Sequence, residues 1–346
     1  MLVKLKFNVV IAVPVLNEAG VIEGVVQNLL DSSADIQSCV VVVADGGSSD
    51  GTADIVRNRF GDHERVKLLH NPGKLQSAGV NLCVQEFAHP QGVLIRCDAH
   101  SDYRADFITR LLTTLNDTGA DSVVVPMDSV GFSCLQKAVA WVSDTPLGSG
   151  GAAHRGGHVK GFVDHGHHAA FKVASFIHAG GYDPTFSHNE DGEFDNRLRA
   201  RGGRIYMDSD IRLKYFPRDS LIKLFRQYFN YGCGRSRTVR RHPGSIRLRQ
   251  MAVPLHLILL LTSLALLPVS GVFGLWPLTY LFVLTIYSLM ITAKRKSACG
   301  LLAGPAAFAM HTGWALGFFY GFLAVRERRW IPEDVVTPAV VTESLS

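Results

Sequence analysis

Asp98 and His100 combine residue types and a spacing that could hold a divalent cation. They stand in the sequence Cys-Asp-Ala-His, directly after an apolar run at residues 92–95. Alternate residues of an extended segment point to the same side, so both side chains are expected to face one ligand. A carboxylate and an imidazole can hold Mg²⁺ or Mn²⁺ and leave positions for phosphate oxygens. A surface Asp–His pair without a ligand is commoner in general, but the apolar run before Asp98 favours a metal site.

Three other polar turns follow apolar runs, and they lie at residues 14–18 (PVLNE), 44–52 (ADGGSSDGT) and 71–81 (NPGKLQSAGVN). Each turn alone is consistent with ordinary turn and helix-cap chemistry, because Ser and Asp side chains cap the helix that follows. Two such strand ends side by side would also supply the hydrogen-bond acceptors that grip a base and a ribose.

The elements that must position these turns alternate in type. Strand-like runs lie at 8–16, 39–45, 66–71, 92–98 and 122–127, and helix-like segments lie near 18–30, 52–59, 75–87 and 105–116. Continuous Val/Ile runs separated by helices predict a parallel sheet that is covered on both faces. Ligands of such sheets bind beyond the carboxyl ends of the strands, which is where Asp98 is expected. The N-terminal residues are predicted to form the first strand and not a signal peptide.

A segment at 128–165 is rich in Gly and Ser, which is typical of a lid or a substrate-binding loop. Five histidines occur in it or just after it, at positions 154, 158, 165, 167 and 168. Their spacing fits no standard zinc site and no cysteine accompanies them. We expect them instead in an acceptor pocket, where His167 and His168 would bind sugar hydroxyls or a diphosphate.

Hydrophobic residues make up 47% of the 346-residue chain, and they are unevenly distributed. Residues 251–293 contain no Asp, Glu, Lys or Arg, and six arginines without an acid precede them within 235–249. Basic residues beside an apolar span mark its cytoplasmic side. A nucleic-acid patch is the alternative interpretation of these arginines. Their position against the apolar stretch favours contact with membrane lipids and no nucleic-acid partner.

Membrane spans are expected near 253–267 and 277–293, closed into a hairpin with both ends inside. A third apolar stretch at 299–325 would place the following arginines outside if it crossed fully. It could instead be re-entrant or interfacial, and its topology stays open.

The six cysteines contain no CxxC pair, which indicates reduced thiols and neither a disulfide framework nor a zinc site. They are Cys39, Cys83, Cys97, Cys134, Cys233 and Cys299.

The motifs together resemble glycosyltransferase family 2, whose members are inverting, nucleotide-sugar-dependent enzymes of the GT-A fold. The matching segments are PVLNE, DGGSSDGT, NPGKLQSAGVN, the aspartate of CDAH and NEDGEFDNRL, in this order over roughly residues 8–235. Within the family, the Asp-Ala-His form and the acidic segment are most similar to the ExoA-like glucosyltransferases of succinoglycan biosynthesis. The ordered set is specific, although no single motif is.

The resemblance implies a site for a UDP-sugar. Pro14, Asn17 and Glu18 from the first turn would line it together with Asp45 and Lys74. Asp45 and Glu18 would contact the uridine.

The resemblance also implies a metal and a base. Asp98 would help to hold Mg²⁺ or Mn²⁺ on the diphosphate, and His100 stands where the family usually has a second aspartate. Either His100 is itself a ligand or Asp98 acts without it. Asp191 matches the family's catalytic base, with Glu190 beside it. An acidic helix N-terminus is the alternative interpretation, since the helix dipole favours acids there, and Asp191 can be both.

The segment 226–235 lies where processive relatives carry a Q-x-x-R-W motif. Gln227 is present, but Arg and Trp do not follow in that spacing, which argues for the addition of one sugar. Arg235 or Arg226 would then lie near the diphosphate, and an amphipathic helix on the membrane is an equally open interpretation.

These inferences predict four regions: a GT-A domain with a Rossmann-like mixed sheet at 1–220, a basic membrane-surface segment at 221–250, transmembrane helices at 251–326 and a polar tail at 327–346. The expected enzyme is a multi-pass inner-membrane protein with a cytoplasmic catalytic domain. It would transfer a hexose, most simply glucose from UDP-glucose, to a polyprenyl-diphosphate-linked sugar. Polyprenyl phosphate or another glycan is the alternative acceptor, and a non-catalytic scaffold that binds nucleotide sugars is the alternative of another class.

Overall fold

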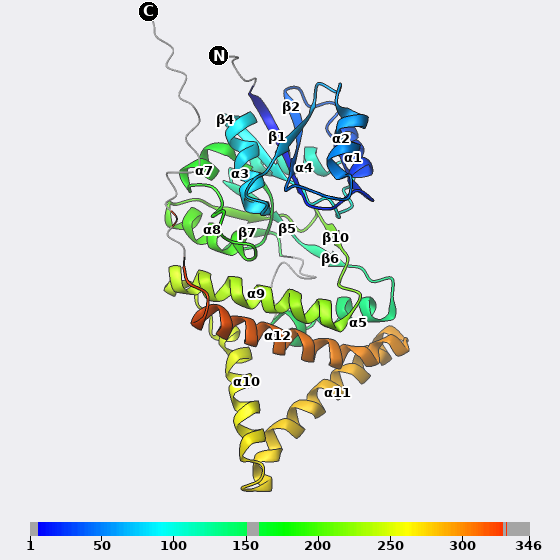
Figure 1. The fold of residues 1–346 in the computed structure, drawn as a ribbon, viewed down its shortest axis with the longest axis vertical. Helices are drawn as coiled ribbons and strands as arrows, with labels where there is room; N and C mark the ends of the chain where they lie inside the picture. Colours follow the sequence, from blue (N-terminus) through cyan, green and yellow to red (C-terminus); the bar gives the residue numbers. More distant parts are fainter. Residues whose placement is uncertain (1–5, 151–158, 328–329, 331–346) are drawn as a thin grey trace, which may run out of the picture. The chain divides into compact units, whose positions relative to one another are not determined.

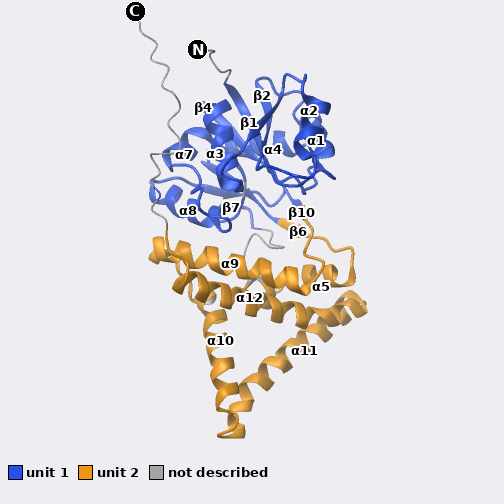
Figure 2. Cartoon of the chain, in the orientation of Figure 1, with its two compact units in different colours: residues 1–126, 158–213, 328–346 blue, residues 127–157, 214–327 orange. Residues whose placement is uncertain are grey.

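The computed structural model describes residues 6–150, 159–327 and 330. The chain forms two compact units (Figure 2). Unit 1 comprises residues 1–126, 158–213 and 328–346, and unit 2 comprises residues 127–157 and 214–327. The segment 127–157, which was expected in the first domain, therefore belongs to unit 2. Residues 151–158, which include two of the five histidines, and nearly all of the expected polar tail lie outside the described residues.

Unit 1 is built on an eight-stranded sheet in the order β3-β2-β1-β4-β8-β5-β9-β7 (Figure 1). The strands are β1 (Phe7–Val15), β2 (Cys39–Asp45), β3 (Val66–His70), β4 (Ala88–Arg96), β5 (Ser122–Val125), β7 (Gly161–Val163), β8 (His167–Lys172) and β9 (Ile205–Met207). The first four are mutually parallel, as predicted. β8 lies antiparallel between β4 and β5, which makes the sheet mixed. Because β8 runs opposite to β4, it begins at the edge of the sheet where β4 ends.

The helices of unit 1 are α1 (Ile22–Ser32), α2 (Thr52–Phe60), α3 (Gln76–Phe87), α4 (Phe107–Thr118), α7 (Val173–His178) and α8 (Glu190–Ala200). The first four agree with the predicted segments to within a few residues. Valines of β1 and β2 pack with Val80 of α3, Phe171 of β8 and Phe194 of α8 in one core. This core fixes the carboxyl ends of β1, β2 and β4 at a single edge of the sheet.

Unit 2 is mainly helical. It contains α5 (Cys134–Ser143), α6 (Pro146–Ser149), α9 (Leu221–Arg241), α10 (Leu248–Leu266), α11 (Leu275–Arg295) and α12 (Ala303–Leu323), with 3₁₀ turns η1 (Pro243–Ser245), η2 (Gly271–Gly274) and η3 (Ala298–Leu302). A two-stranded sheet of β6 (Met127–Ser129) and β10 (Leu213–Tyr215) lies at its start. α10 and α11 form a hairpin closed by η2 (Figure 1).

One helix among the described residues, Gly271–Arg295, is long and apolar enough to cross a membrane. The apolar helix Gln250–Leu266 is shorter. The third apolar stretch forms α12, which packs along α9 in the same direction: Gly313, Gly317 and Gly321 lie against the α9 backbone near Phe225, Phe229 and Cys233. Glycines at every fourth position let two helices approach this closely. Of the two or three expected membrane spans, the structure therefore supports one candidate helix.

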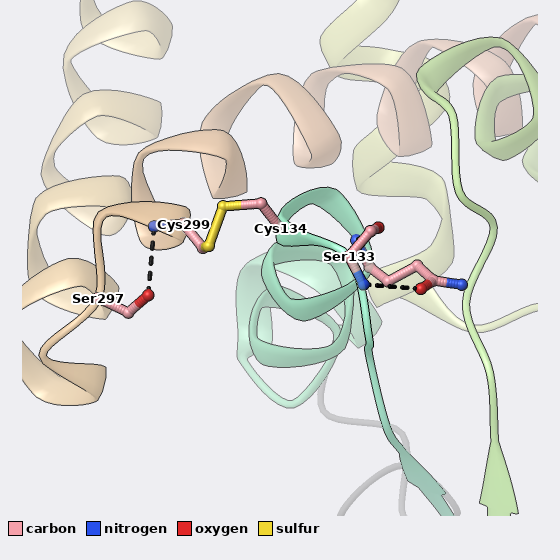
Figure 3. Close-up of a disulfide and its surroundings, with 5 residues drawn as sticks. Ser133, Cys134, Ser297 and Cys299 are labelled. Atoms are coloured by element: carbon pink, nitrogen blue, oxygen red, sulfur yellow. Dashed lines mark hydrogen bonds between the residues drawn. A yellow bond between two sulfur atoms is a disulfide. The ribbon is translucent and has the colours of Figure 1, made fainter.

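A disulfide joins Cys134 of α5 to Cys299 of η3, 165 residues apart in the chain (Figure 3). The prediction of reduced thiols is wrong for this pair and correct for Cys39, Cys83, Cys97 and Cys233. Cysteine spacing could not reveal the pair, because it depends on α5 packing against η3.

Candidate active site

The turns after β1 and β2 are joined by hydrogen bonds. Oδ1 of Asn17 accepts from the backbone N–H of Ser49 at 2.9 Å, and the backbone N–H of Asn17 donates to Oγ of Ser48 at 2.8 Å. Pro14 lies just before, in β1, opposite Ala44 of β2. The structure therefore brings the first two predicted motifs together at one edge of the sheet.

Asp45 shapes the turn that follows it. Its carboxylate accepts hydrogen bonds from the backbone N–H of Gly47 at 3.0 Å and from the backbone N–H and hydroxyl of Ser48 at 3.1 and 2.5 Å. The side chain is buried. These bonds explain why an acid ends β2, and the predicted uridine contact of Asp45 stays a prediction.

The third motif lies at the same edge. Its Lys74 has a φ of 60° and an exposed side chain. The backbone carbonyl of Lys74 lies against Gly46, next to Asp45, so the turns after β2 and β3 are adjacent.

The helix that begins in this motif anchors the rest of the site. Nε2 of Gln76 donates to Oδ1 of Asp98 at 2.6 Å. The side chain of Asn81 binds both backbone groups of Tyr182, at 2.7 and 2.9 Å. The motif that suggested a helix cap thus orients groups in two distant segments.

Asp98 stands just beyond β4, which ends at Arg96. The backbone N–H of Asp98 donates to the hydroxyl of Tyr103 at 2.6 Å, and the backbone turns back from Asp98 to Ser101. The alternation of side chains along a strand does not extend through this turn. His100 accordingly lies against Glu18, with Nδ1 3.6 Å from Oε1, and its ring is 64% exposed. A metal-binding role for His100 stays a prediction.

Arg96 is a buried cation among three carboxylates. Its guanidinium donates to Oδ1 of Asp191 at 2.6 Å and to Oε1 of Glu190 at 3.2 Å, and its Nε lies 3.8 Å from Oδ1 of Asp98. The hydroxyl of Tyr182 donates to the same oxygen of Asp191 at 2.8 Å. The end of β4 and the start of α8 are thereby held together.

The charged groups around Arg96 shift one another's pKa values. Burial disfavours the charged form of Arg96, yet Asp191 foremost, with Asp98 and Glu190, raises the pKa of the guanidinium well above its ordinary value. Burial and then the charge of Asp191 raise the pKa of Glu190 to about 7, although Arg96 acts in the opposite direction. Glu190 therefore titrates near neutral pH.

His167 lies between the two aspartates that the sequence singled out. Its Nε2 is 3.8 Å from Oδ2 of Asp98, and its Nδ1 is 4.0 Å from Oδ2 of Asp191. Asp98, His167 and Asp191 come from the turn after β4, from β8 and from α8, so the fold brings the two carboxylates to either side of one imidazole. The backbone of His168 pairs with Val124 in β8, and its side chain lies outside the described part of the chain.

Comparisons with known proteins give the family of the chain. Residues 10–179 match the family model described as "Glycosyl transferase family 2". The chain is also 41% identical over 326 residues, 92% of its length and 96% of the relative's, to "Succinoglycan biosynthesis protein ExoA" of Rhizobium meliloti (strain 1021).

The chain belongs to glycosyltransferase family 2.

Two more distant proteins are similar to this glycosyltransferase over most of its length. A "Dolichyl N-acetyl-alpha-D-glucosaminyl phosphate 3-beta-D-2,3-diacetamido-2,3-dideoxy-beta-D-glucuronosyltransferase" of Methanococcus voltae is 20% identical over 90% of the chain and 96% of the relative. The solved structure of a mannosyltransferase from Pyrobaculum calidifontis, in complex with GDP-Man and Mn²⁺, has a TM-score of 0.58 and 16% identity, and it covers 92% of this chain and 88% of that one. The fold is therefore GT-A.

The residues of this glycosyltransferase fit a divalent cation that is shared with a ligand. The described residues contain no cluster of three His, Cys, Asp or Glu side chains that could hold a metal ion. Asp98 is partly exposed and fixed through Oδ1 by Gln76, and its Oδ2 faces His167. A cation with few protein ligands and several phosphate or water oxygens is the usual arrangement for Mg²⁺.

Arg235 lies in unit 2, where it holds the turn between α9 and α10. Its Nε donates to Gln250 at 3.0 Å, and its terminal nitrogen donates to the carbonyl of Ser245. Burial, with the charge of Arg247 added, lowers the pKa of Arg235 to about 10. Its predicted place near a diphosphate stays a prediction.

Sequence reasoning missed Arg96, Gln76 and Tyr182 as members of this site. Arg96 carried the clearest signal, because a charged residue inside the apolar run that leads to Asp98 must find a buried partner. Nothing in the local sequence of Tyr182 indicated its contact with Asp191.

Proposed function

We propose that this glycosyltransferase inverts the anomeric centre as it transfers a hexose from a UDP-sugar, most simply glucose from UDP-glucose, to a polyprenyl-diphosphate-linked sugar. The product would feed the synthesis of a succinoglycan-like exopolysaccharide. The observation that carries the proposal is the pair of fixed aspartates, Asp98 and Asp191, on either side of His167.

Asp191 is the base in this proposal. Arg96 and the Tyr182 hydroxyl both donate to Oδ1 and hold the carboxylate in place. Oδ2, on the side of His167, takes the proton from the acceptor hydroxyl as that oxygen attacks the anomeric carbon. A single displacement of this kind breaks the bond from the sugar to UDP and inverts the anomeric carbon.

Asp98 serves the leaving diphosphate. Mg²⁺ or Mn²⁺ held by Asp98, with His167 or His100 as a second ligand, would neutralise the charge that develops on the leaving group. The Mn²⁺ in the related mannosyltransferase supports this assignment. Glu18, Asn17, Lys74 and the turn shaped by Asp45 would hold the nucleotide at the adjoining strand ends.

A lipid-linked acceptor is supported by unit 2. An apolar cavity of about 730 Å³ lies between α9, α11 and α12, lined by Phe225, Leu284 and Phe308 among others. Its wall hydroxyls on Thr285 and Ser288 bond to backbone carbonyls of their own helix, so the wall suits an alkyl chain. The name of the Methanococcus relative, which contains a dolichyl-linked sugar phosphate, also supports such an acceptor.

The same features support a location at the inner membrane. α10 and then the helix Gly271–Arg295 would cross the bilayer as a hairpin, with the basic residues of α9 and those at the end of α11 on the cytoplasmic side. The second candidate acceptor, polyprenyl phosphate itself, keeps this location and changes only the product.

The test follows radiolabel from UDP-sugars into organic-extractable lipid in membranes that contain the wild type, Asp191→Asn or Asp98→Ala, with and without EDTA and Mn²⁺. We expect label from UDP-glucose that disappears in both variants and with the chelator. Mass spectrometry of the product separates the acceptors, because a sugar added to a diphosphate-linked saccharide and a sugar on a monophosphate differ in mass. Binding of UDP-glucose without any transfer would favour the scaffold.

A further inference from the structure

The two oxygens of the Asp98 carboxylate lie in different surroundings. Oδ1 accepts a hydrogen bond from Nε2 of Gln76 at 2.6 Å, and Nε of Arg96 lies 3.8 Å from the same oxygen. Oδ2 lies 3.8 Å from Nε2 of His167. Two nitrogen donors, one of them on a guanidinium, therefore face Oδ1, whereas Oδ2 faces the imidazole that separates Asp98 from Asp191.

Arg96 makes Oδ1 an unfavourable ligand for a cation. The arginine side chain is 5% exposed, and its Nε makes no hydrogen bond within the described part of the chain. A cation at Oδ1 would bring a second positive charge towards a guanidinium that solvent screens little. The charges of the site therefore favour a cation on Oδ2 alone.

The surrounding fold fixes the orientation of this carboxylate. The buried hydroxyl of Tyr103 accepts from the backbone N–H of Asp98 at 2.6 Å and donates to its carbonyl at 3.1 Å. Gln76 is the first residue of α3, and Nδ2 of Asn71 holds the turn before it by donating to the carbonyl of Leu75 at 2.9 Å. Because both ends of the Gln76–Asp98 bond are anchored, the carboxylate keeps one orientation.

The number of oxygens that Asp98 offers bears on the choice of cation. Mg²⁺ demands a near-ideal octahedron and is bound through few carboxylates, with water and phosphate oxygens in the other positions. Ca²⁺ is larger, takes six to eight oxygens and often uses both oxygens of one carboxylate. A carboxylate whose Oδ1 is engaged offers one oxygen, which suits Mg²⁺ or Mn²⁺ and not Ca²⁺.

We propose that Gln76 is a positioning residue that makes Asp98 a one-oxygen ligand and so selects Mg²⁺ or Mn²⁺ over Ca²⁺. This inference rests on the proposed function, since it takes Asp98 as a metal ligand. The loss of a hydrogen-bond partner of a metal ligand typically lowers metal affinity about 10- to 100-fold. A changed preference between two cations is the sign of selection, because a merely structural role of Gln76 would not alter it.

The decisive variant is Gln76→Met, which keeps the length of the side chain and removes the donor. Gln76→Asn keeps the amide on a side chain one methylene shorter and so withdraws it from Oδ1. It tests the same bond if the first variant does not fold. Gln27→Met is the matched control, because Gln27 is exposed in α1 and its Nε2 donates to Oδ1 of Asp31 at 2.8 Å.

The experiment measures the binding of cations and does not depend on sugar transfer. The full chain in detergent is titrated with Mn²⁺ in the presence of UDP, and the electron paramagnetic resonance signal of free Mn²⁺ gives the bound amount. Asp98→Ala at the same UDP concentration gives the Mn²⁺ that is bound elsewhere. Ca²⁺ is then titrated against the bound Mn²⁺, and the ratio of the half-saturating Ca²⁺ and Mn²⁺ concentrations is compared among the variants.

We expect Gln76→Met to raise the half-saturating Mn²⁺ concentration about tenfold. The half-saturating Ca²⁺ concentration should not rise, because the released Oδ1 can join Oδ2 as a ligand of the larger cation. The ratio of the Ca²⁺ to the Mn²⁺ concentration should therefore fall about tenfold. Gln76→Asn should behave in the same way, and Gln27→Met should match the wild type.

An unchanged ratio in both Gln76 variants overturns the inference, whether or not the Mn²⁺ affinity falls. A wild type that binds no more Mn²⁺ than Asp98→Ala refutes the metal site at Asp98 and this inference with it. A wild type that binds Mn²⁺ through Asp98 but transfers no sugar refutes the proposed function alone, and the ratio then still decides the role of Gln76.

Discussion

Arg96 and Asp191 are 95 residues apart in the chain and 2.6 Å apart in the fold. Their ion pair joins the end of β4 to the first turn of α8, and the guanidinium is almost fully buried. The proposed base is therefore positioned by a side chain from the strand that also carries Asp98. One contact sets the distance between the two ends of the site.

Replacement of Arg96 should abolish transfer and reduce stability. Arg96→Met leaves Asp191, Glu190 and Asp98 close together without a cation, and the loss of one partner of a buried pair costs about 3–5 kcal/mol. Arg96→Lys should keep part of the stability and little of the activity, because an ammonium cannot make the paired contacts of a guanidinium. Thermal midpoints in detergent and the rate of sugar transfer check both expectations.

Two control variants separate the positioning of Asp191 from the loss of a positive charge. Arg104→Met removes an exposed arginine that pairs with Asp106, and it should change neither quantity measurably. Tyr182→Phe removes only the second donor to Asp191, so a rate reduced with the fold intact is expected. Full activity in Arg96→Met would mean that the proposed base does not depend on Arg96 for its position.

Glu190 should make stability depend on pH. Its pKa in the folded chain is raised to about 7 from an ordinary 4.5. Protonated Glu190 therefore adds to the free energy of unfolding below about pH 4.5, and this contribution is lost as the pH rises through 7. The loss amounts to roughly 3 kcal/mol for a shift of this size. Glu190→Gln removes the titration and keeps a polar partner for Arg96.

The difference in thermal midpoint between Glu190→Gln and the wild type should therefore grow in favour of the variant from pH 5 to pH 8. Glu23→Gln, an exposed acid of α1, is the control and should show no such trend. A constant difference across this range would mean that Glu190 is ionised throughout.

Local patterns predicted the first half of unit 1 well. Runs such as Val40 to Val43 are fully buried in β2, and a continuous apolar run of this kind leaves few alternatives to a central strand. The turns that follow are specified by short-range hydrogen bonds, such as those of Asp45 with its own loop. Both kinds of information are local and can be read from the sequence.

Contacts between distant segments account for what the sequence did not show. His100 was paired with Asp98 because it is near in sequence, but β4 ends before both residues, and the imidazole that the fold brings to Asp98 is that of His167. The disulfide and the packing of α12 on α9 depend likewise on segments far apart in the chain. Composition alone could not distinguish a helix against protein from one against lipid.

The Cys134–Cys299 disulfide should stabilise unit 2. Bridges that close long loops typically contribute about 2–4 kcal/mol, chiefly by restricting the unfolded chain. Cys134→Ser should lower the thermal midpoint under non-reducing conditions, and dithiothreitol should bring the wild type down to the same value. Cys233→Ser, which removes a free thiol, is the control. Labelling of Cys134 by a thiol reagent without prior reduction would contradict the bridge.

Gly317 tests the close packing of α12 on α9. A Cβ at this position would overlap the backbone carbonyl of Phe229, and over-packing of this kind costs about 1–3 kcal/mol. Alanine also gains about 1 kcal/mol of helix propensity over glycine, so the two effects oppose each other. Backbone atoms cannot move aside as side chains do, and we therefore expect Gly317→Ala to lower the thermal midpoint.

Gly24→Ala in α1, where a Cβ meets nothing within 4 Å, shows the propensity effect alone and should raise the thermal midpoint. If both variants are stabilised, α12 does not pack on α9 at this distance, and it is then free to cross the membrane as a separate span.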